Sequence, residues 1–481
     1  MVSELNFTTD IVIGLEIHVE LNTNTKLFCS CPTHHDPNKE DIPNSRTCPV
    51  CLGHPGSKPV LNKKVVEYAT KLGLAMNCEI DNELIFSRKS YFYPDNCKNY
   101  QITQYEQPLC NHGSVKLKSG KKIGITRIHI EEDPASLTHP ASMHNSEYVL
   151  VDYNRSGNPL CEIVTEPDMT SPEEAREFMN KLATMLEYLE IFDVNEGIIK
   201  ADANVSIKES GYIRSEVKNV TGFKDIERAL TYEINRQKQA IKDGEVLVQD
   251  TRGWDSEYGI TRRVRIKETE DDYGYIIDPD LVVTDVTDEF IAEIKANLPE
   301  MADEKHNKLK EQGIADDNAE IISKDKDLAK IYELLTEKIT DTTKVSKWVR
   351  RDLVKAVNYH KKTIKDLNLD VVIPKYIKVL QAEIDGIVIP QIAFRITSSI
   401  TENENLDVDS EIEKNKTNND DSAIENIAKE VIKEQSKNIE KYKAGDEKII
   451  NFLVGQVMRK SQGKANPSKA KELLLKNIKN N

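Results

Sequence analysis

Two carboxylates and one imidazole occupy alternate positions of a single short stretch, 11–21. Glu16, His18 and Glu20 alternate there with aliphatic residues, and the side chains of a strand point alternately to its two faces. One face therefore enters a core, and the other presents groups that can bind a metal ion or transfer a proton. The abundance of Ile and Val favours a strand over a helix. The alternative interpretation is an antiparallel sheet with one solvated face, on which these groups have no chemical role.

The same alternation recurs in three later stretches of the chain, 123–133, 200–207 and 212–218. A short turn that contains glycine separates the last two, which predicts a hairpin. Four strands that each present charged groups from one face favour a polar cradle over a random solvated surface. The polar residues that share a face are Arg127, His129 and Glu131 in the first stretch, Asp202, Asn204 and Ser206 in the second, and Arg214, Glu216 and Lys218 in the third.

Three consecutive acids, Glu131, Glu132 and Asp133, end the first of these later strands. Such a run is costly without a positive partner, and Mg²⁺ suits it because this ion takes carboxylate oxygens and keeps several waters. Carboxylates that hold Mg²⁺, together with Lys or Arg side chains that hold phosphates, fit phosphoryl transfer. The chain has no Gly-x-x-x-x-Gly-Lys-Ser/Thr motif, so an ATP site here is not a P-loop.

Basic and aromatic residues are interleaved in 88–93 and again in 100–105. Cations such as Arg88 and Lys89 can hold phosphate, and rings such as that of Tyr91 can stack on a base. The alternative interpretation is a tyrosine-rich sheet edge along which the Arg and Lys stems lie.

Two closely spaced pairs of cysteines flank a polar loop. Cys29, Cys31, Cys48 and Cys51 have the grouping of a closed, tetrahedral zinc site. The ion is expected to be structural, because the loop is too polar to form a core of its own. Two histidines inside the loop are alternative ligands, and four ordinary cysteines are the alternative interpretation.

The composition limits the location and the partners of the protein. The 481 residues carry a net charge of −15 and contain no run of about eighteen apolar residues. The first residues have neither the basic region nor the apolar core of a signal peptide. We therefore expect a cytoplasmic protein without a membrane partner. The acidic total argues against DNA, although RNA binding needs only a local basic patch.

The chain changes character after residue 290. Apolar residues recur at helical spacing across 291–400, which predicts a helical domain. Eight acids, two lysines and many asparagines in 401–421 indicate an acidic, disordered linker over 401–425. In the tail, 426–481, the last 31 residues hold seven basic residues and one acid, a net charge of +6. A basic helical module on a tether suits binding of a polyanion, and a merely solvated lysine-rich face is the alternative.

Eight motifs run nearly from end to end of the chain in the order of one known family. Through them the chain resembles the B subunit of the tRNA-dependent amidotransferase, which makes Gln-tRNA(Gln) or Asn-tRNA(Asn) from misacylated precursors. The motifs are Ile13 to Leu21, Arg88 to Asp95, His129 to Asp133, Val151 to Gly157, Ala201 to Asn204, Glu216 to Asn219, Phe452 to Met458 and Lys464 to Pro467.

The resemblance implies an α+β fold with three parts. A cradle-shaped, kinase-like domain over 1–290 is built on a largely antiparallel sheet and carries the zinc-binding loop at 29–51. A helical domain over 291–400 follows, and a small all-α tail domain over 426–481 holds the tRNA.

The resemblance also implies an enzyme, a ligase that forms a carbon–nitrogen bond with glutamine as the amido donor. ATP phosphorylates the side-chain carboxylate of the misacylated amino acid. Ammonia, released from glutamine in the amidase A subunit and passed through a tunnel, then displaces the phosphate. A small C subunit completes the heterotrimer. The substrate is Glu-tRNA(Gln), Asp-tRNA(Asn) or both.

Site residues follow from the family motifs and the polar strands together. The family pattern implies Glu16, His18 and Glu132 as magnesium ligands, whereas strand alternation groups Glu131 with His129. The residues expected to act in catalysis, or at the substrate or the tunnel mouth, are Glu16, His18, Lys89, Tyr91, Glu132, Asp202 and Glu216. The residues expected to bind the nucleotide are Arg88, Lys89, Arg127, Asn204, Arg214 and Lys218.

Two alternative functions remain at this point. One is the archaeal paralogue specific for Glu-tRNA(Gln), which carries an additional synthetase-like insertion for which 291–400 has no room. The other is a non-catalytic, RNA-binding scaffold whose partner performs all of the catalysis.

Overall fold

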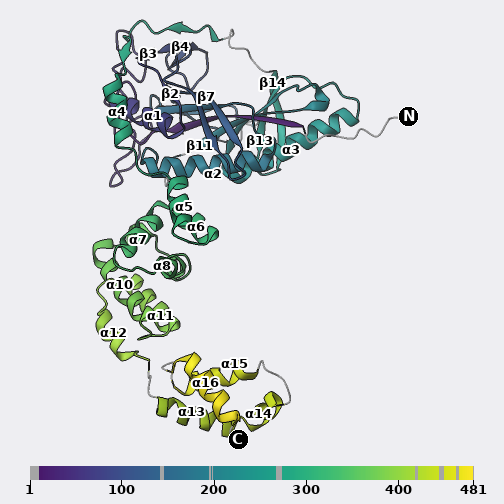
Figure 1. The fold of residues 1–481 in the computed structure, drawn as a ribbon. Coiled ribbons are helices and arrows are strands. Elements are labelled where there is room, and N and C mark those ends of the chain that lie inside the picture. The colour runs from purple at the N-terminus through teal and green to yellow at the C-terminus, as the bar shows by residue number, and fades with distance from the viewer. Residues whose placement is uncertain are drawn as a thin grey trace. The chain divides into compact units, whose positions relative to one another are not determined.

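The computed structural model describes residues 10–140, 146–193, 197, 199–266, 273–417, 421–443, 449–461 and 465–479. The chain divides into two compact units, Met1–Met301 and Ala302–Asn481. The first unit combines a large sheet with helices, and the second is helical (Figure 1). The predicted α+β class, with a largely antiparallel sheet followed by helices, is confirmed.

A nine-stranded sheet forms the centre of the first unit, and β1 lies in its middle. All neighbouring strands are antiparallel except β12 and β13, which are parallel. In spatial order the strands are β14 (Ile260–Ile266), β13 (Asp250–Asp255), β12 (Ser215–Thr221), β11 (Ile199–Ile207), β1 (Ile11–Glu20), β10 (Pro159–Thr165), β7 (Lys122–Glu132), β6 (Cys110–Lys116) and β2 (Glu79–Ile80).

Three helices cover the apolar face of this sheet: α1 (Lys63–Ala75), α2 (Pro172–Leu189) and α3 (Phe223–Lys242). Figure 1 shows α2 and α3 along the same side of the sheet. The aliphatic residues of β1 from Ile13 onward are at most 1% exposed against them, and each contributes about 1.5–3 kcal/mol of burial free energy. Ser171 caps α2 by accepting a hydrogen bond from the Glu174 N–H, as its Ser-Pro-Glu-Glu start predicts.

The opposite face of the sheet carries the polar side chains of β1. In the strand register Glu162 of β10 lies beside His18, and His129 of β7 lies beside Glu162. On the other side of β1, Asp202 of β11 pairs with Glu16. A three-stranded sheet of β15 (Ile276–Ile277), β4 (Ser87–Ser90) and β5 (Tyr100–Thr103) contacts β7. The register therefore brings side chains that are far apart in sequence onto one surface.

Two pairs of short strands and one helix complete the first unit: β3 (Glu83–Leu84) with β16 (Thr284–Asp285), β8 (Ser136–Thr138) with β9 (Leu150–Asp152), and α4 (Asp288–Ala296). The predicted hairpin is confirmed, because β11 and β12 are antiparallel neighbours joined by a short 3₁₀ turn, Lys208–Ser210.

The second unit contains two separate hydrophobic cores, one within 309–408 and one within 424–478. The helices of the first are α5 (Ala302–Glu311), α6 (Asp316–Lys324), α7 (Lys326–Thr336), α8 (Thr342–Trp348), α9 (Val354–Tyr359), α10 (Leu369–Ile384), α11 (Pro390–Glu402) and α12 (Val408–Lys414), with a π-helical turn at Val349–Leu353 and a 3₁₀ turn at Ile364–Asp366. The helices of the second are α13 (Asp421–Glu434), α14 (Ser436–Lys443), α15 (Ile449–Lys460) and α16 (Pro467–Lys479).

The acidic segment expected to be disordered, 401–425, is helical over much of its described length. It contains the end of α11, all of α12 and the start of α13. Val408 is buried in the core of the preceding helices, and Asp407 caps α12 by accepting a hydrogen bond of 3.2 Å from the Ser410 N–H. The prediction of disorder is wrong for these helical residues, because acids at a helix N-terminus stabilise it and one apolar residue anchors it.

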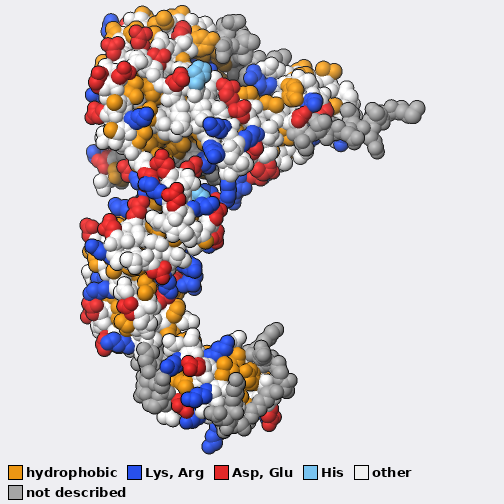
Figure 2. All heavy atoms as spheres, in the orientation of Figure 1, with side chains coloured by type: hydrophobic (Ala, Val, Ile, Leu, Met, Phe, Trp, Pro, Cys, Tyr) orange, Lys and Arg blue, Asp and Glu red, His pale blue; other side chains and the backbone are white. Residues whose placement is uncertain are grey.

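Acidic and basic side chains are interspersed along the face drawn in Figure 2. Within the described residues, no helix combines the length and the apolar character that crossing a membrane requires.

Candidate functional site

Three potential metal ligands meet on the polar face of the central sheet. His18 of β1, Glu131 of β7 and Glu162 of β10 each place one donor atom within 4.8 Å of the other two. His18 Nε2 lies 3.5 Å from Glu131 Oε1 and 3.4 Å from Glu162 Oε2. Both carboxylates are buried, so their charges need a cation nearby. One imidazole and two carboxylates are a donor set that fits a divalent metal ion.

Two further basic side chains surround this cluster. His129 Nε2 lies 3.6 Å from Glu162 Oε2 and 3.8 Å from Glu131 Oε2. Burial raises the pKa of Glu162, but His129 and His18 outweigh it and hold this pKa well below its ordinary value. Burial lowers the pKa of His18, but Glu162 and Glu131 raise it to about 9. Lys89, from β4, also keeps a raised pKa beside Glu131 despite its burial. The carboxylates are therefore ionised at neutral pH.

A second group of charges lies beside the first, on β1, β11 and β12. Lys218 Nζ lies 2.8 Å from Asp202 Oδ2 and 3.6 Å from Glu216 Oε1. Asn204 donates a hydrogen bond of 3.0 Å to Glu16 Oε1. Burial opposes the charge of Lys218, but Asp202 and Glu216 keep its pKa above its usual range. Three strands thus bring acids and a lysine together, as their alternation indicated.

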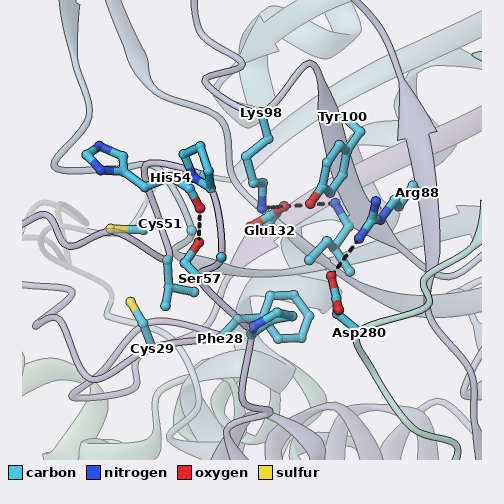
Figure 3. Close-up of a pocket in the computed structure, with 17 residues that line it drawn as sticks. Phe28, Cys29, Cys51, His54, Ser57, Arg88, Lys98, Tyr100, Glu132 and Asp280 are labelled. Atoms are coloured by element: carbon cyan, nitrogen blue, oxygen red, sulfur yellow. Dashed lines mark hydrogen bonds and ion pairs between the residues drawn. The ribbon is translucent and has the colours of Figure 1, made fainter.

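Glu132 points away from both of these groups. It forms a buried ion pair with Lys98 and accepts a hydrogen bond of 2.8 Å from the Ile102 N–H. The pair lines a cavity of about 230 Å³. Figure 3 shows Cys29 and Cys51 approaching this cavity from one side and Lys98 from the other. The structure therefore places Glu131, and not Glu132, beside His18, and it also places Glu131 near His129, the residue with which alternation alone had grouped it.

The guanidinium of Arg88 forms structural ion pairs with two aspartates. Its guanidinium lies 2.7 Å from Asp278 Oδ2 and 3.1 Å from Asp280 Oδ2, and it stacks over the ring of Tyr100 at 4.2 Å. The side chain of Asp278 is fully buried. The Arg88–Asp278 ion pair therefore fixes the segment after β15 against β4. Neighbouring Lys89 points to the opposite side, toward Glu131, because successive side chains of a strand alternate.

The remaining predicted residues are Tyr91, Arg127 and Arg214. Tyr91 stands close to both Glu131 and Glu132, and burial raises the pKa of its phenol. Arg127 is half-buried on β7, on the face of Glu131, and among the described residues no carboxylate lies within 4 Å of its guanidinium. Arg214 is exposed and lines a separate open depression. The structure thus places Tyr91 near Glu131, puts Arg127 on the face of β7 that carries Glu131, and leaves Arg214 in the separate depression.

The four predicted zinc ligands are close together. Cys29, Cys31, Cys48 and Cys51 place their Sγ atoms within 4.8 Å of one another, and those of Cys48 and Cys51 are 3.9 Å apart. A tetrahedral ion bonded to sulfur at about 2.3 Å separates its ligands by about 3.8 Å. A hydrogen bond from Cys29 lowers the pKa of Cys51 to about 5, and burial raises that of Cys31 to about 11. The four thiols fit a closed structural site.

Two family profiles match most of the chain. The one described as "GatB/GatE catalytic domain" matches residues 11–292, and the one described as "GatB domain" matches residues 330–478. The chain belongs to the GatB family. The resemblance found from the sequence motifs is thereby confirmed, and the two matched regions correspond to the sheet-containing unit and most of the helical unit.

Similar GatB-family proteins are named as the same component of one enzyme. The B subunit of the aspartyl/glutamyl-tRNA(Asn/Gln) amidotransferase from Thermoanaerobacter pseudethanolicus is 42% identical over 477 residues, 96% of this chain and 98% of that protein. The protein of the same name from Geotalea daltonii is 42% identical over 479 residues, with 97% and 98% covered. That from Clostridium botulinum is 40% identical over 476 residues, with 96% and 98% covered.

Two residues of this GatB-family site were not predicted from the sequence. Glu162 is the single acid of the strand Pro159–Thr165, which is otherwise apolar apart from its last residue. A lone carboxylate in such a strand was the signal that could have found it, because a buried acid needs a partner. Lys98 follows Cys97 in a loop, and no local pattern connects it to Glu132, which lies 34 positions away.

Proposed function

We propose that this chain activates a carboxylate on a misacylated tRNA within an amidotransferase complex. It uses ATP to phosphorylate the side chain of Glu-tRNA(Gln), of Asp-tRNA(Asn) or of both, and converts the product to the amide with ammonia. An amidase A subunit and a small C subunit are the proposed partners. The observation that carries this proposal is the convergence of His18, Glu131 and Glu162 on one sheet face, with Lys89 beside Glu131.

The proposed reaction consists of two displacements. A carboxylate oxygen of the aminoacyl group attacks the γ-phosphorus of ATP, and ADP leaves. The nitrogen of ammonia then attacks the carbonyl carbon of the acyl phosphate, inorganic phosphate leaves with the former carbon–oxygen bond pair, and the nitrogen loses a proton. In-line transfer of this kind depends chiefly on positioning and on charge stabilisation.

Residues of the polar face supply both requirements. Lys89, which lies beside Glu131, and Arg127, which shares the face of β7 that carries Glu131, are the cations proposed to hold phosphate oxygens. Lys218 holds Asp202 and Glu216 in place, which fixes the charged surface beside Glu16. His18, Glu131 and Glu162 are the proposed holders of Mg²⁺, which when bound offsets the charge of the transferring phosphoryl group.

The cavity beside Glu132 supports a route for ammonia. It is small and polar, and its walls include the Lys98–Glu132 ion pair and the Arg88–Asp280 ion pair. Burial raises the pKa of the Tyr91 phenol, and the charges of Asp95, Glu131 and Glu132 raise it further. Ammonia that reaches Glu132 is only one residue from the strand face that holds the reacting carboxylate.

A complex made with the A and C subunits tests the proposal directly. Purified complex, ATP and glutamine are incubated with Glu-tRNA(Gln) or Asp-tRNA(Asn), and amide formation is measured for each. Hydroxylamine, which traps an acyl phosphate as a hydroxamate, reports the activation step without ammonia. If hydroxamate forms equally well without this chain, the alternative of a non-catalytic scaffold holds and the proposal is wrong.

Arg127→Gln is expected to raise the KM for ATP about 10–100-fold in this assay. The guanidinium has no carboxylate partner among the described residues, and a charge-assisted hydrogen bond to phosphate contributes about 1.5–3 kcal/mol. Arg214→Gln is the matched control, because Arg214 lies in a separate depression and should change KM less than about twofold. Equal effects of the two substitutions would contradict the assignment of Arg127 to the nucleotide.

The tail domain is proposed to bind the tRNA through its phosphates. The core of α13 to α16 is separate from that of the preceding helices, so truncation after Thr417 removes it and leaves the other core intact. We expect tRNA affinity to fall at least about tenfold and its salt dependence to weaken. In the full chain, Lys471→Gln/Lys476→Gln, which changes two lysines on the surface of α16, should reproduce part of this loss. Unchanged affinity after truncation would refute the assignment.

A further inference from the structure

Three tyrosines from two distant segments of the first unit form an aromatic cluster. The rings of Tyr105 and Tyr275 are stacked, with centroids 4.0 Å apart and planes inclined by 9°. Tyr273 contacts Tyr275 edge-on, with 6.3 Å between centroids and 61° between planes. We call these three residues the tyrosine cluster. Tyr105 is 39% exposed and the other two are half-buried, so the cluster lies at the surface and not in the core.

Two anchored segments hold the stacked rings beside the strand that carries Glu131. Gln104, directly before Tyr105, accepts a hydrogen bond of 2.9 Å from a backbone N–H of β7. Thr103, one residue earlier, donates a hydrogen bond of 3.2 Å to Glu131 Oε2. On the other side of the stack, Tyr275 directly precedes β15, which pairs with β4. Hydrogen bonds to β7 and strand pairing with β4 therefore fix where the two rings lie.

Lys89 of β4 connects the tyrosine cluster with the charged groups of the polar face. Its Nζ lies 5.0 Å from the centre of the Tyr273 ring, a cation–π distance. Burial lowers the pKa of Lys89, but Glu131 and Tyr275 raise it above its ordinary value. One ammonium group thus lies close to both the rings and the carboxylates. A flat aromatic surface beside a cation suits a nucleotide, because the base stacks on the ring and the phosphate binds the cation.

Packing is the alternative explanation for these tyrosines, and it accounts for only part of the arrangement. Buried aromatic area stabilises a fold, which explains the contacts of Tyr275 with its two neighbours. It does not explain the exposed ring of Tyr105, which extends the stack to the surface near a lysine. Both substrates of the proposed reaction contain an adenosine 5′-phosphate unit. In ATP this unit carries the phosphates that react, and at the 3′ end of tRNA it carries the amino acid on its ribose.

We propose that the tyrosine cluster and Lys89 form a binding subsite for an adenosine 5′-phosphate unit. The adenine stacks on the exposed ring of Tyr105, and Lys89 binds the adjoining phosphate. The inference rests on the proposed function, which supplies the two ligands that contain such a unit, ATP and the tRNA end. Stacking suits either ligand, since every base has an aromatic face. The experiment therefore has one arm for each.

Fluorescence of 2-aminopurine, an adenine analogue that is quenched when it stacks on another ring, tests this proposal on the complete complex without turnover. The probe replaces adenine in two separate ligands, a β,γ-imido triphosphate that is not cleaved and the last nucleotide of uncharged tRNA. The wild type should quench one of them. Tyr105→Leu should abolish this quenching and raise the Kd of that ligand about 5–100-fold, while the Kd of the other ligand stays within about twofold. The quenched ligand identifies the source of the adenine.

Control variants separate stacking from a general disturbance of the surface. Tyr105→Phe retains the ring and should retain both quenching and affinity. Tyr258→Leu replaces an exposed tyrosine before β14, an edge strand distant from β7 in the sheet order, and should behave like the wild type. If Tyr105→Leu does not assemble, which loss of glutamine hydrolysis would show, Tyr275→Leu takes its place.

Three results would overturn the proposal. They are the absence of quenching with either probe in the wild type, quenching that persists in Tyr105→Leu, and equal weakening of both ligands by that substitution. Because no step of the reaction takes place in the measurement, failure of the proposed phosphoryl transfer would leave its outcome unaffected.

Discussion

Glu162→Gln is expected to lower the rate of ATP-dependent carboxylate activation about 10³-fold. The Glu162 carboxylate is buried between His18 and His129, at 3.4 and 3.6 Å, and glutamine matches its size without its charge. The substitution removes one of the two carboxylates that can reach a divalent ion there. A loss of about 4 kcal/mol of charge stabilisation corresponds to this change in rate.

Hydroxamate formation from Glu-tRNA, ATP and hydroxylamine measures this effect separately from ammonia delivery. Glutamine hydrolysis by the A subunit should continue, which shows that the complex has assembled. Glu166→Gln is the matched control, since Glu166 follows β10 directly and is exposed; its rate should stay within about twofold of the wild type. A Glu162→Gln complex that retains more than a tenth of the wild-type rate would remove Glu162 from the proposed site.

Strand alternation and the family pattern differ on one residue of this site. The spacing of Arg127, His129 and Glu131 indicated one shared face, and in the structure Glu131 lies 3.8 Å from His129 and 3.5 Å from His18. The family pattern had favoured Glu132, which instead pairs with Lys98. Local periodicity was sufficient here because a strand has only two faces.

Strand alternation could not predict contacts between segments that are distant in sequence. Arg88 and Lys89 are adjacent and both basic, yet one is neutralised by Asp278 and the other faces Glu131. Alternation separates the two side chains, but the partner of Arg88 comes with the pairing of β4 and β15, about 190 positions later in the chain. The helix at Val408–Lys414 shows the same limit, because one buried valine and a cap outweighed the acidic composition.

The zinc-binding loop combines features that local sequence spacing predicts with contacts to distant segments that it does not predict. Strand alternation does not apply to a loop, but the cysteine spacing alone indicated a metal site. In the structure the four thiols lie close together. What the spacing did not reveal is the position of the loop beside the Lys98–Glu132 pair. Cys97 Sγ donates to the backbone oxygen of Cys51 at 3.1 Å, and Lys98 is the next residue. The loop is thus a wall of the cavity proposed to conduct ammonia.

Cys29→Ser/Cys48→Ser is expected to abolish zinc binding and to open this wall. Structural zinc sites contribute about 10–16 kcal/mol of apparent binding free energy in small domains, far more than the loop's hydrogen bonds, such as that from the Arg46 N–H to Asn154 Oδ1 at 2.7 Å. Elemental analysis should fall from about one zinc per chain to nearly none. Limited proteolysis should then cleave within 32–47, and glutamine-dependent amidation should fall more than amidation supplied with free ammonium.

Cys97→Ser is the control that separates loss of the metal from loss of a nearby thiol. Its hydroxyl can still donate to the Cys51 backbone oxygen, and Cys97 lies outside the four-thiol group. Zinc content and resistance to proteolysis should therefore equal those of the wild type. Undiminished zinc in the double variant would rule out a thiolate site. If zinc is lost and the rates of amidation with glutamine and with free ammonium fall equally, the zinc is structural and the loop has no role in ammonia delivery. An opened cavity wall would lower only the rate with ammonia that arrives through the cavity.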